Sequence, residues 1–327
     1  MEFSCGLFPD RRAPELAALA EALGYRRVWV YDSPALGADV WVTLARIAER
    51  TKRIGIGPGV LVPSLRHVMV TAAAIGTVAQ LAAGRLAVAI STGFTGRVLL
   101  GERSMRWTAV AAYVQALKAL LRGEEVEFEG HLMSMLHPSD AVAKRPVPIV
   151  ITANGPKGID VARRLGDGVM SGGFPCPGFG WSIVSGGGTV LDEGENPGSP
   201  RALAAAGPFV TALYHLFYEL PGLGMNLEQL PGGRRWRAEV DAIPGAVRHL
   251  RLHESHFLRV DARDRGLVSA ETVAALTWTG TASALRQRFE QYESQGATEV
   301  FFEPTGHDLA RELTALARAV GLSPPKD

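Results

Sequence analysis

Cysteine is nearly absent from this sequence of 327 residues, in which Cys5 and Cys176 are the only two. They lie far apart, and neither has a cysteine or histidine companion at the spacing of a metal site. We therefore expect neither a disulfide framework nor a zinc site, and the sequence predicts no metal ligands. Two reduced thiols are typical of a cytoplasmic protein.

The sequence also lacks an excess of charge of either sign and has no long apolar run. The 34 Lys and Arg residues balance 33 Asp and Glu residues, so nothing predicts binding to nucleic acid or to an anionic membrane. The longest apolar run, residues 68–79, is interrupted by Thr71 and Thr77 and is too short to cross a bilayer. The N-terminus lacks the basic and apolar regions of a secretory signal. These absences favour a soluble, cytoplasmic protein.

What the sequence has in abundance is alternation between short apolar strands and amphipathic helices. Strand-like segments begin near Phe3, Val28, Ile54 and Leu86, about one βα unit apart. Eight strand–helix units predict an α/β protein, a single (β/α)8 TIM barrel over residues 1–327. The four remaining strands are predicted at residues 147–151, 169–170, 209–213 and 298–302.

Two segments depart from this alternation, and we interpret both as insertions. Residues 172–200 are rich in glycine, proline and serine. Continued alternation predicts a helix there, although the triple glycine at 186–188 opposes one. Residues 221–266 are mixed and polar, and they predict helices outside the repeating unit. The helix predicted at 67–82 is apolar nearly all round, which favours deep burial or a homodimer contact.

The segment at 147–173 predicts a strand, a tight turn, a helix and a second strand. The turn is formed by Asn154, Gly155, Pro156 and Lys157. Pro156 suits the first helical position, and the glycine lets the backbone approach a ligand closely. The free N–H groups of the first helical turn, together with the lysine, make a site for an anion such as phosphate. An ordinary turn without a ligand explains this segment equally well.

Other nucleotide-binding motifs are not supported. Gly55, Gly57 and Gly59 lack the third glycine of a dinucleotide fingerprint at the required offset, and Pro58 opposes a helix start there. The glycine-rich loop of nucleotide hydrolases, the serine-hydrolase elbow and the paired-histidine zinc motif do not occur in the sequence.

Three segments of the sequence resemble the bacterial luciferase-like family of flavin and deazaflavin oxidoreductases. They are residues 53–91, 147–170 and 279–302, and residues 113–130 also match. The branch that looks most similar contains methylenetetrahydromethanopterin reductase and related F420-dependent enzymes. The resemblance excludes the two predicted insertions. It implies a luciferase-like barrel with its cofactor at the C-terminal mouth.

The resemblance also implies where the cofactor lies. In this family a non-prolyl cis peptide at the end of the third strand supports the redox ring, and the match places it at Gly59–Val60. A simple bend of the strand at this position is the alternative. The cofactor-binding residues implied are Gly59, Val60 and Leu61 behind the ring, Ser91, Thr92 and Gly93 at its polar edge, and Asn154, Gly155, Pro156, Lys157, Ser171 and Gly172 around its phosphate.

Asp32, Ser33 and His67 are the candidate catalytic residues. Asp32 follows the second strand and holds a substrate or, alternatively, caps a helix. F420-dependent dehydrogenases of this family typically have a histidine where Ser33 stands and a glutamate where Phe94 stands. These departures favour a hydride transfer that depends mainly on orientation. His67 starts a helix and is either a ring contact or a cap.

Several other polar residues have less weight as site residues. Glu303 and His307 follow the last strand, and His215 follows the predicted seventh strand. His253 and His256 are expected on a solvated surface. The arginines at 97, 103 and 106 attract an acidic ligand or simply face solvent.

The sequence therefore predicts an F420-dependent oxidoreductase that transfers a hydride between reduced deazaflavin and a small organic substrate. One alternative is an FMN-dependent luciferase-like monooxygenase that uses oxygen, with a separate flavin or F420 reductase as partner. A second alternative is a non-catalytic barrel that binds a cofactor or acts as a scaffold, because the usual glutamate and histidine are missing.

Overall fold

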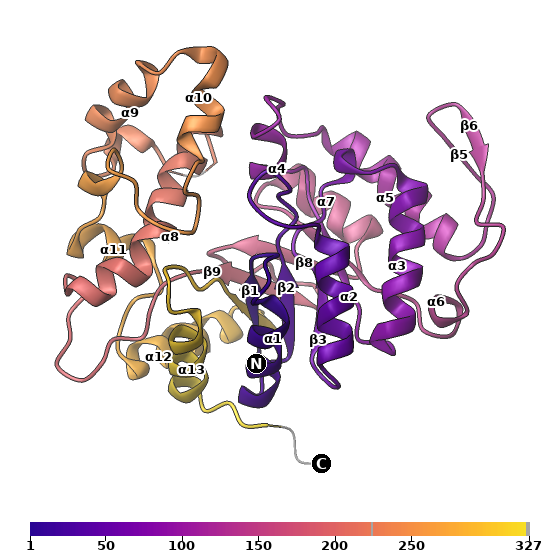
Figure 1. The fold of residues 1–327 in the computed structure, drawn as a ribbon, viewed down its shortest axis with the longest axis horizontal. Helices are drawn as coiled ribbons and strands as arrows, with labels where there is room; N and C mark the ends of the chain where they lie inside the picture. Colours follow the sequence, from indigo (N-terminus) through magenta and orange to yellow (C-terminus); the bar gives the residue numbers. More distant parts are fainter. Residues whose placement is uncertain (224, 325–327) are drawn as a thin grey trace.

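The computed structural model describes residues 1–223 and 225–324 of the chain. Residue 224, in the predicted insertion, and residues 325–327, at the end of the predicted domain, lie outside the described residues. Within the described part, eight parallel strands form one sheet in the order β3-β2-β1-β10-β9-β8-β7-β4. Helices cover the outside of this sheet (Figure 1).

The sheet closes into a barrel between its first and last strands. Isolated bridges from Ile56 to Leu86 and from Leu61 to Ile90 join the β3 segment to the β4 segment. The predicted (β/α)8 barrel is thereby confirmed. The barrel strands are β1 (Glu2–Leu7), β2 (Arg27–Val30), β3 (Gly55–Pro58), β4 (Val88–Ile90), β7 (Ile149–Thr152), β8 (Gly168–Gly172), β9 (Ser182–Gly186) and β10 (Glu299–Phe302).

The barrel helices begin and end at residues suited to capping. Asp39 accepts hydrogen bonds from the Trp41 and Val42 amides, at 2.8 and 3.0 Å, and so caps the second helix. Thr281 caps the penultimate helix, and Gly24 ends the first with a φ of +92°. The helices around the barrel are α1 (Ala13–Leu23), α2 (Val40–Arg50), α3 (Val68–Ala82), α4 (Thr95–Val98), α5 (Trp107–Leu121), α7 (Pro156–Leu165), α12 (Ala282–Ser294) and α13 (Leu309–Val320).

The predicted seventh strand at 209–213 is wrong, and so is the helix predicted within 172–200. The seventh barrel strand is β9, and residues 209–213 lie inside α8 (Pro200–Glu219). A five-residue apolar run does not distinguish a strand from a buried helix. Ser199 begins α8, since its side chain accepts a hydrogen bond from the Ala202 amide at 3.1 Å.

The glycines at the end of β9 have a packing role. A Cβ at Gly186 would lie 2.5 Å from the Trp278 ring, and one at Gly187 would lie 2.3 Å from the Phe209 ring. The glycines therefore admit two large aromatic side chains rather than marking a flexible loop. The triple glycine at 186–188 was therefore a correct indication that this segment does not form a helix.

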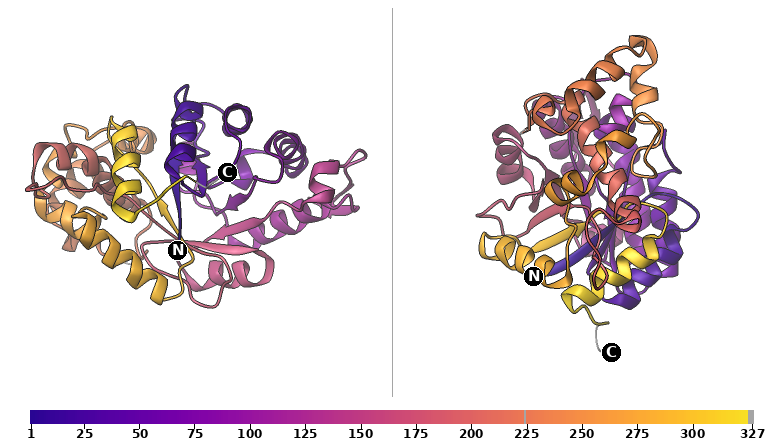
Figure 2. Two further views of the ribbon diagram at one scale, coloured as in Figure 1. Left: turned by 90° about the horizontal axis from the view of Figure 1, so that it is seen from below. Right: turned by 90° about the vertical axis from the view of Figure 1, so that its left-hand side faces the viewer.

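A helical insertion begins with α8 and has its own core. It consists of α8, α9 (Gly233–Asp241), α10 (Gly245–Leu252) and α11 (Ala270–Leu276), so helices are confirmed within 221–266. Tyr214, Trp236 and Val240 lie at the centre of a hydrophobic cluster separate from that of the barrel. The insertion lies at one end of the molecule (Figure 2).

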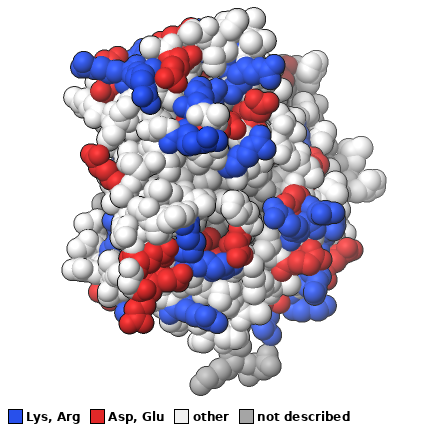
Figure 3. All heavy atoms as spheres, turned by 60° about the vertical axis from the view of Figure 1, so that its left-hand side comes forward, with Lys and Arg blue, Asp and Glu red and all other residues white. Residues whose placement is uncertain are grey.

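The connection at 123–144 forms a hairpin and a short helix. The hairpin pairs β5 (Val126–Phe128) with β6 (His131–Met133), and α6 (Asp140–Lys144) follows. In Figure 2 the hairpin lies at the opposite end of the molecule from the insertion. None of the described helices combines the length and the apolar character that a bilayer crossing requires. On the face in Figure 3, basic and acidic side chains form mixed groups.

Candidate functional site

The carboxyl ends of the barrel strands surround a cavity of about 190 Å³, here called the mouth cavity. This end of a TIM barrel is where active sites are built. The predicted residues Asp32, Ser33, Gly59 and Val60 line it. Its other walls come from the ends of β1, β7, β8, β9 and β10, from α4 and from the turn after α10.

Glu303, one residue after β10, is the acidic residue best suited to proton transfer in the mouth cavity. Burial raises the pKa of its carboxyl to about 7, although the hydroxyls of Ser185 and Tyr31 offset part of the rise. Burial, followed by the Glu303 charge, raises the pKa of Tyr31 well above 10, so the phenol keeps its proton. A carboxyl that titrates near neutrality can act as a general acid or base. In the sequence, only the position of Glu303 directly after a barrel strand indicates this role.

The peptide bond between Gly59 and Val60 is cis, which confirms the backbone geometry predicted at the end of the third strand. A Cβ at Gly59 would lie only 2.6 Å from the Cβ of Trp29, so this position has no room for a side chain. Leu61, in contrast, is fully buried and bridges to Ile90. It closes the barrel and does not line the mouth cavity.

The Asp32 carboxylate is buried and already paired. Arg66 Nη1 donates to its two oxygens at 2.9 and 2.8 Å, and the Val62 amide donates at 3.3 Å. Burial raises the pKa of Asp32 despite the opposing effect of Arg66. The alternative prediction, that Asp32 caps a helix, is wrong, because Asp39 caps α2. Asp32 instead fastens the loop that follows β3.

The predicted anion-binding turn lies at the same end of the barrel. Asn154 Oδ1 accepts a hydrogen bond from the Gly172 amide at 2.8 Å, which fixes the turn after β7 to the end of β8. Gly155 is the N-cap residue of α7, and within the described part of the chain no side chain caps this helix. Pro156 and Lys157 are exposed in its first turn. The helix therefore presents free N–H groups and a lysine to solvent.

A second helix begins beside this turn. A Cβ at Gly158 would lie 2.3 Å from the Trp107 ring, so the first turns of α7 and α5 are in contact. Arg106 precedes α5 and is exposed, and no side chain among the described residues caps that helix. The adjoining hollow of about 790 Å³ is also lined by Arg97 and Arg103. Two helix N-termini and the exposed Arg103, Arg106 and Lys157 thus meet near the mouth, whereas Arg97 is paired with Glu102.

The remaining predicted ring and phosphate residues make internal contacts. Ser91 donates to the Thr152 carbonyl at 2.8 Å, and the buried Ser171 donates to the Phe174 carbonyl. The Thr92 carbonyl accepts a backbone hydrogen bond. Gly93 is buried with a φ of +77°, a conformation that favours glycine. None of the predicted residues 91–93 lines the mouth cavity, whose α4 side is formed by residues 94–96.

His67 lies outside the mouth. Its Nδ1 accepts a hydrogen bond from the Met69 amide at 3.2 Å, so the ring caps α3. It lines a different hollow with Tyr113 and Phe128. The structure gives no support for His67 as a catalytic residue.

The helical insertion covers the mouth cavity. Phe257, after α10, stacks on Tyr31 with ring centroids 5.9 Å apart and an angle of 18°. The neighbouring His256 also lines the cavity and lies 3.3 Å from the hydroxyl of Thr95 in α4. The predicted solvated position of His253 and His256 is wrong, since these residues are only 0% and 5% exposed.

These two histidines belong to a buried polar cluster with His215. His215 Nε2 lies 3.0 Å from Asp264 Oδ2, and its ring stacks on Trp236. Burial alone would raise the pKa of Asp264, but hydrogen bonds from His215, Arg263 and Trp236 lower it to about 2. Burial lowers the pKa of His253 to about 3 and that of His256 well below 6.5.

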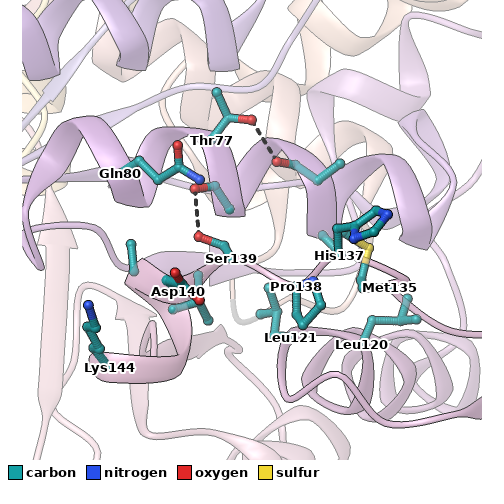
Figure 4. Close-up of a pocket in the computed structure, with 15 residues that line it drawn as sticks. Thr77, Gln80, Leu120, Leu121, Met135, His137, Pro138, Ser139, Asp140 and Lys144 are labelled. Atoms are coloured by element: carbon teal, nitrogen blue, oxygen red, sulfur yellow. Dashed lines mark hydrogen bonds between the residues drawn. The ribbon is translucent and has the colours of Figure 1, made fainter.

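A larger hollow, of about 730 Å³, lies outside the barrel. Figure 4 shows α3 beside the segment that leads into α6, where Ser139 donates to the Gly76 carbonyl at 3.2 Å. Small residues of α3 form much of its wall. Because it lies away from the strand ends, this hollow is not part of the candidate site.

The sequence matches the family described as luciferase-like monooxygenase over residues 7–212, more than half of the chain. The chain belongs to this family. A 5,10-methylenetetrahydromethanopterin reductase from Methanolobus tindarius is 30% identical over 166 residues, which are 50% of each protein. An F420-dependent glucose-6-phosphate dehydrogenase from Kineococcus radiotolerans is 33% identical over 180 residues, 50% of this chain and 52% of that protein. The chain thus spans about half the length of the curated relatives it matches.

Solved structures with the same fold extend over nearly the whole chain. The F420-dependent tetrahydromethanopterin reductase from Methanopyrus kandleri has a TM-score of 0.67 at 16% identity and covers 98% of both chains. An FMN-bound oxygenating constituent of 3,6-diketocamphane monooxygenase from Pseudomonas putida has a TM-score of 0.57 at 14% identity, over 98% of this chain and 97% of that one. At this identity the likeness establishes the fold.

Proposed function

We propose that the protein is an F420-dependent oxidoreductase that transfers a hydride between reduced deazaflavin and a small organic substrate. Family membership supports the oxidoreductase class, and the named curated relatives support the deazaflavin. The observation that carries the proposal is the uncapped N-terminus of α7 beside Lys157, placed at the mouth of the barrel.

The phosphate end of the cofactor fits this turn. The exposed N–H groups of α7 and the Lys157 ammonium supply donors and positive charge, and Gly155 leaves the space above its backbone open. Arg106 and the start of α5 extend the positive region, which suits an acidic cofactor tail. Asn154 would keep its bond to Gly172 and hold the turn in place.

The ring end needs more space than the structure provides. Small-molecule sites have volumes of about 300–1,000 Å³, whereas the mouth cavity has about 190 Å³. Phe257 is the side chain to displace, because it belongs to the insertion and stacks across the opening on Tyr31. Its φ of +62° lies in the left-handed region, which is unfavourable for a residue with a side chain.

When bound, the deazaflavin supplies or accepts the hydride. We propose that Glu303 moves the accompanying proton at the heteroatom of a carbonyl or imine substrate. Tyr31 would orient the substrate through its phenol proton. This pair stands in for the glutamate and histidine that related dehydrogenases have at the Phe94 and Ser33 positions. Asp32 remains a positioning residue, because Arg66 occupies its carboxylate.

Cofactor titration tests this proposal directly. Purified full-length protein is titrated with F420 and, separately, with FMN, and the cofactor fluorescence is followed. Lys157→Ala should weaken binding of the true cofactor by about 1.5–3 kcal/mol, or roughly 10- to 150-fold, if the ammonium contacts a phosphate. Lys144→Ala, an exposed lysine on α6, is the matched control and should leave affinity unchanged. Unchanged affinity in Lys157→Ala would remove the turn from the site.

An FMN-dependent monooxygenase is the second candidate, favoured by the description of the family itself. It would need reduced flavin from a separate reductase. Oxygen consumption during turnover separates the two, because deazaflavin chemistry transfers hydride without oxygen. If neither cofactor binds at micromolar concentration, the non-catalytic alternative gains support.

The homodimer stays a prediction, with α2 and α3 as the proposed contact. Val42 of α2 and Val70 of α3 are 62% and 55% exposed on these adjacent helices. Burying such residues against a second copy would remove apolar surface from water. Light scattering at micromolar concentration should give the dimer mass, and Val70→Glu should reduce it to that of a monomer.

A further inference from the structure

His215, His253 and His256 bring three imidazoles together inside the helical insertion. One ring nitrogen from each residue lies within 4.8 Å of the other two, and all three side chains are buried. The Nδ1 atoms of His253 and His256 are 3.4 Å apart. Two nitrogens bound to one tetrahedral zinc ion, at 2.0–2.1 Å each, are about 3.3 Å apart. One pair therefore already has the required spacing.

The second nitrogen has a hydrogen-bond partner in the His215 and His256 rings, whereas that of His253 lies farther from its nearest carboxylate. His215 Nε2 lies 3.0 Å from Asp264, His256 Nε2 lies 3.3 Å from Thr95, and His253 Nε2 lies 3.9 Å from Glu219. Metal-binding histidines characteristically have their other nitrogen on a carboxylate or similar partner, which sets the tautomer and the ring orientation. This arrangement leaves Nδ1 of His215 and Nδ1 of His256 to bind an ion, and Nδ1 of His253 lies next to the latter.

An unpaired buried nitrogen points to a missing partner. His215 is 2% exposed, and its Nδ1 has no hydrogen-bond partner among the described residues. In the neutral tautomer whose Nε2 donates to Asp264, Nδ1 carries a lone pair that nothing in the described structure satisfies. A buried polar atom without a partner is costly, and a metal ion would supply the acceptor for this lone pair.

We propose that these three histidines bind one divalent transition-metal ion, with zinc as the first candidate. Neutral imidazole nitrogens suit zinc, cobalt, nickel and copper, and three protein ligands leave one position for water or another small ligand. The other two nitrogen–nitrogen distances must shorten by about 1.5 Å at most to reach the spacing around a zinc ion. Rotation of the side chains can supply this movement. This proposal revises the expectation from the sequence that the protein has no metal ligands.

The ion would join two parts of the insertion that are distant in sequence. His215 comes from α8, whereas His253 and His256 come from the turn after α10. His256 also reaches Thr95 of the barrel helix α4. Metal binding would therefore hold the turn that bears Phe257 against both α8 and the barrel mouth. This inference does not depend on which redox cofactor the barrel binds.

The test uses full-length protein freed of metal with a chelator. Titration with Co²⁺ should give the visible absorption bands of a tetrahedral site and saturate at one ion per chain, and Zn²⁺ should displace it. X-ray absorption of the zinc form should report imidazole nitrogens at about 2.0 Å. Hydrogen exchange of the turn after α10 should slow on zinc binding.

Variants identify the ligands. His215→Ala and His256→Ala should each weaken zinc binding by at least about 100-fold, and Asp264→Asn by about 10- to 100-fold through loss of orientation. His249→Ala, on α10 but outside the cluster, is the matched control and should bind normally. Circular dichroism of each variant checks that the fold is retained.

Two results would overturn the proposal. One is wild-type protein that takes up no stoichiometric zinc or cobalt. The other is a folded His215→Ala variant that binds zinc as tightly as the wild type. The wild-type titration decides the matter even if a variant does not fold.

Discussion

The barrel and the helical insertion bury their side chains in different ways. The barrel core is formed mainly by aliphatic residues such as Val28, Ile90 and Ile151, all fully buried. The insertion has a smaller apolar cluster around Trp236, and next to it lies a buried network centred on Asp264. Apolar contacts are non-directional and depend mainly on volume, whereas a buried network requires each partner.

This difference predicts how the two regions fail. A truncation in the barrel leaves a cavity and weakens the whole molecule, because the insertion depends on the barrel on which it is built. Loss of one member of the network leaves several polar groups unsatisfied but confines the damage to the insertion. The first two of the following predictions test this contrast directly, and the others concern single residues of the barrel.

The largest effect is expected from Asp264→Ala in the insertion. The change removes the acceptor of buried donors on His215, Trp236 and Arg263. Breaking such a buried ionic network typically costs about 3–5 kcal/mol. Hydrogen exchange should show α9 and α10 opening more readily by this amount while the barrel strands keep their protection.

The surface pair Arg122–Glu124 supplies the control for this variant. Both side chains are more than half exposed, and Glu124→Ala should leave exchange unchanged. Equal loss of protection in the barrel strands of Asp264→Ala would contradict the proposed separation of the two regions.

Ile151→Ala in β7 should lower the free energy of unfolding by about 3 kcal/mol, because the side chain is fully buried and the change leaves a cavity. Urea denaturation measures the loss. Protection against hydrogen exchange should fall in the barrel and the insertion together. If only the barrel were affected, the insertion would be an independently stable unit.

The free energy of unfolding should change by about 2–3 kcal/mol with pH because of Glu303, and Glu303→Gln should remove this change. The pKa of Glu303 is raised from 4.5 to about 7, so the folded state holds this proton more tightly than the unfolded state. Its contribution is fully present below pH 4.5 and is lost as pH rises through 7. Urea unfolding of both proteins between pH 4.5 and 8 checks this sign.

The same variant should also remove a step near pH 7 from the pH–rate profile of hydride transfer. A step that persists in Glu303→Gln would assign it to another group. Tyr31→Phe is the companion variant, since it removes the neighbouring phenol and leaves the carboxyl.

The smallest effect is expected at the end of α3. Ala83 has a φ of +47°, in the left-handed region that glycine adopts without penalty. Ala83→Gly should therefore raise the free energy of unfolding by about 0.5–1 kcal/mol. Ala73→Gly, at an exposed position within the same helix, should lower it by about 1 kcal/mol. Thermal unfolding compares the two, and a destabilised Ala83→Gly would contradict the strain assigned to this residue.

Local patterns were sufficient for much of the barrel. The strand at Ile149–Thr152, the uncapped turn at Gly155 and the cap at Asp39 all follow from short-range rules of periodicity, glycine and capping. The seventh strand was missed because Phe209–Leu213 is equally compatible with a helix, and tertiary packing decided between the two. The cis link at Gly59–Val60 came from family resemblance, since no local pattern indicates it.

The sequence by itself determined most of the alternating strands and helices, the barrel they form and the uncapped turn at Lys157, because these depend on neighbours along the chain. Only the tertiary structure decided that Glu303 meets Tyr31, that Phe257 covers the mouth and that His215 joins His256. These residues are far apart in sequence, and their chemistry changes only when folding removes water and brings a partner within a few ångströms.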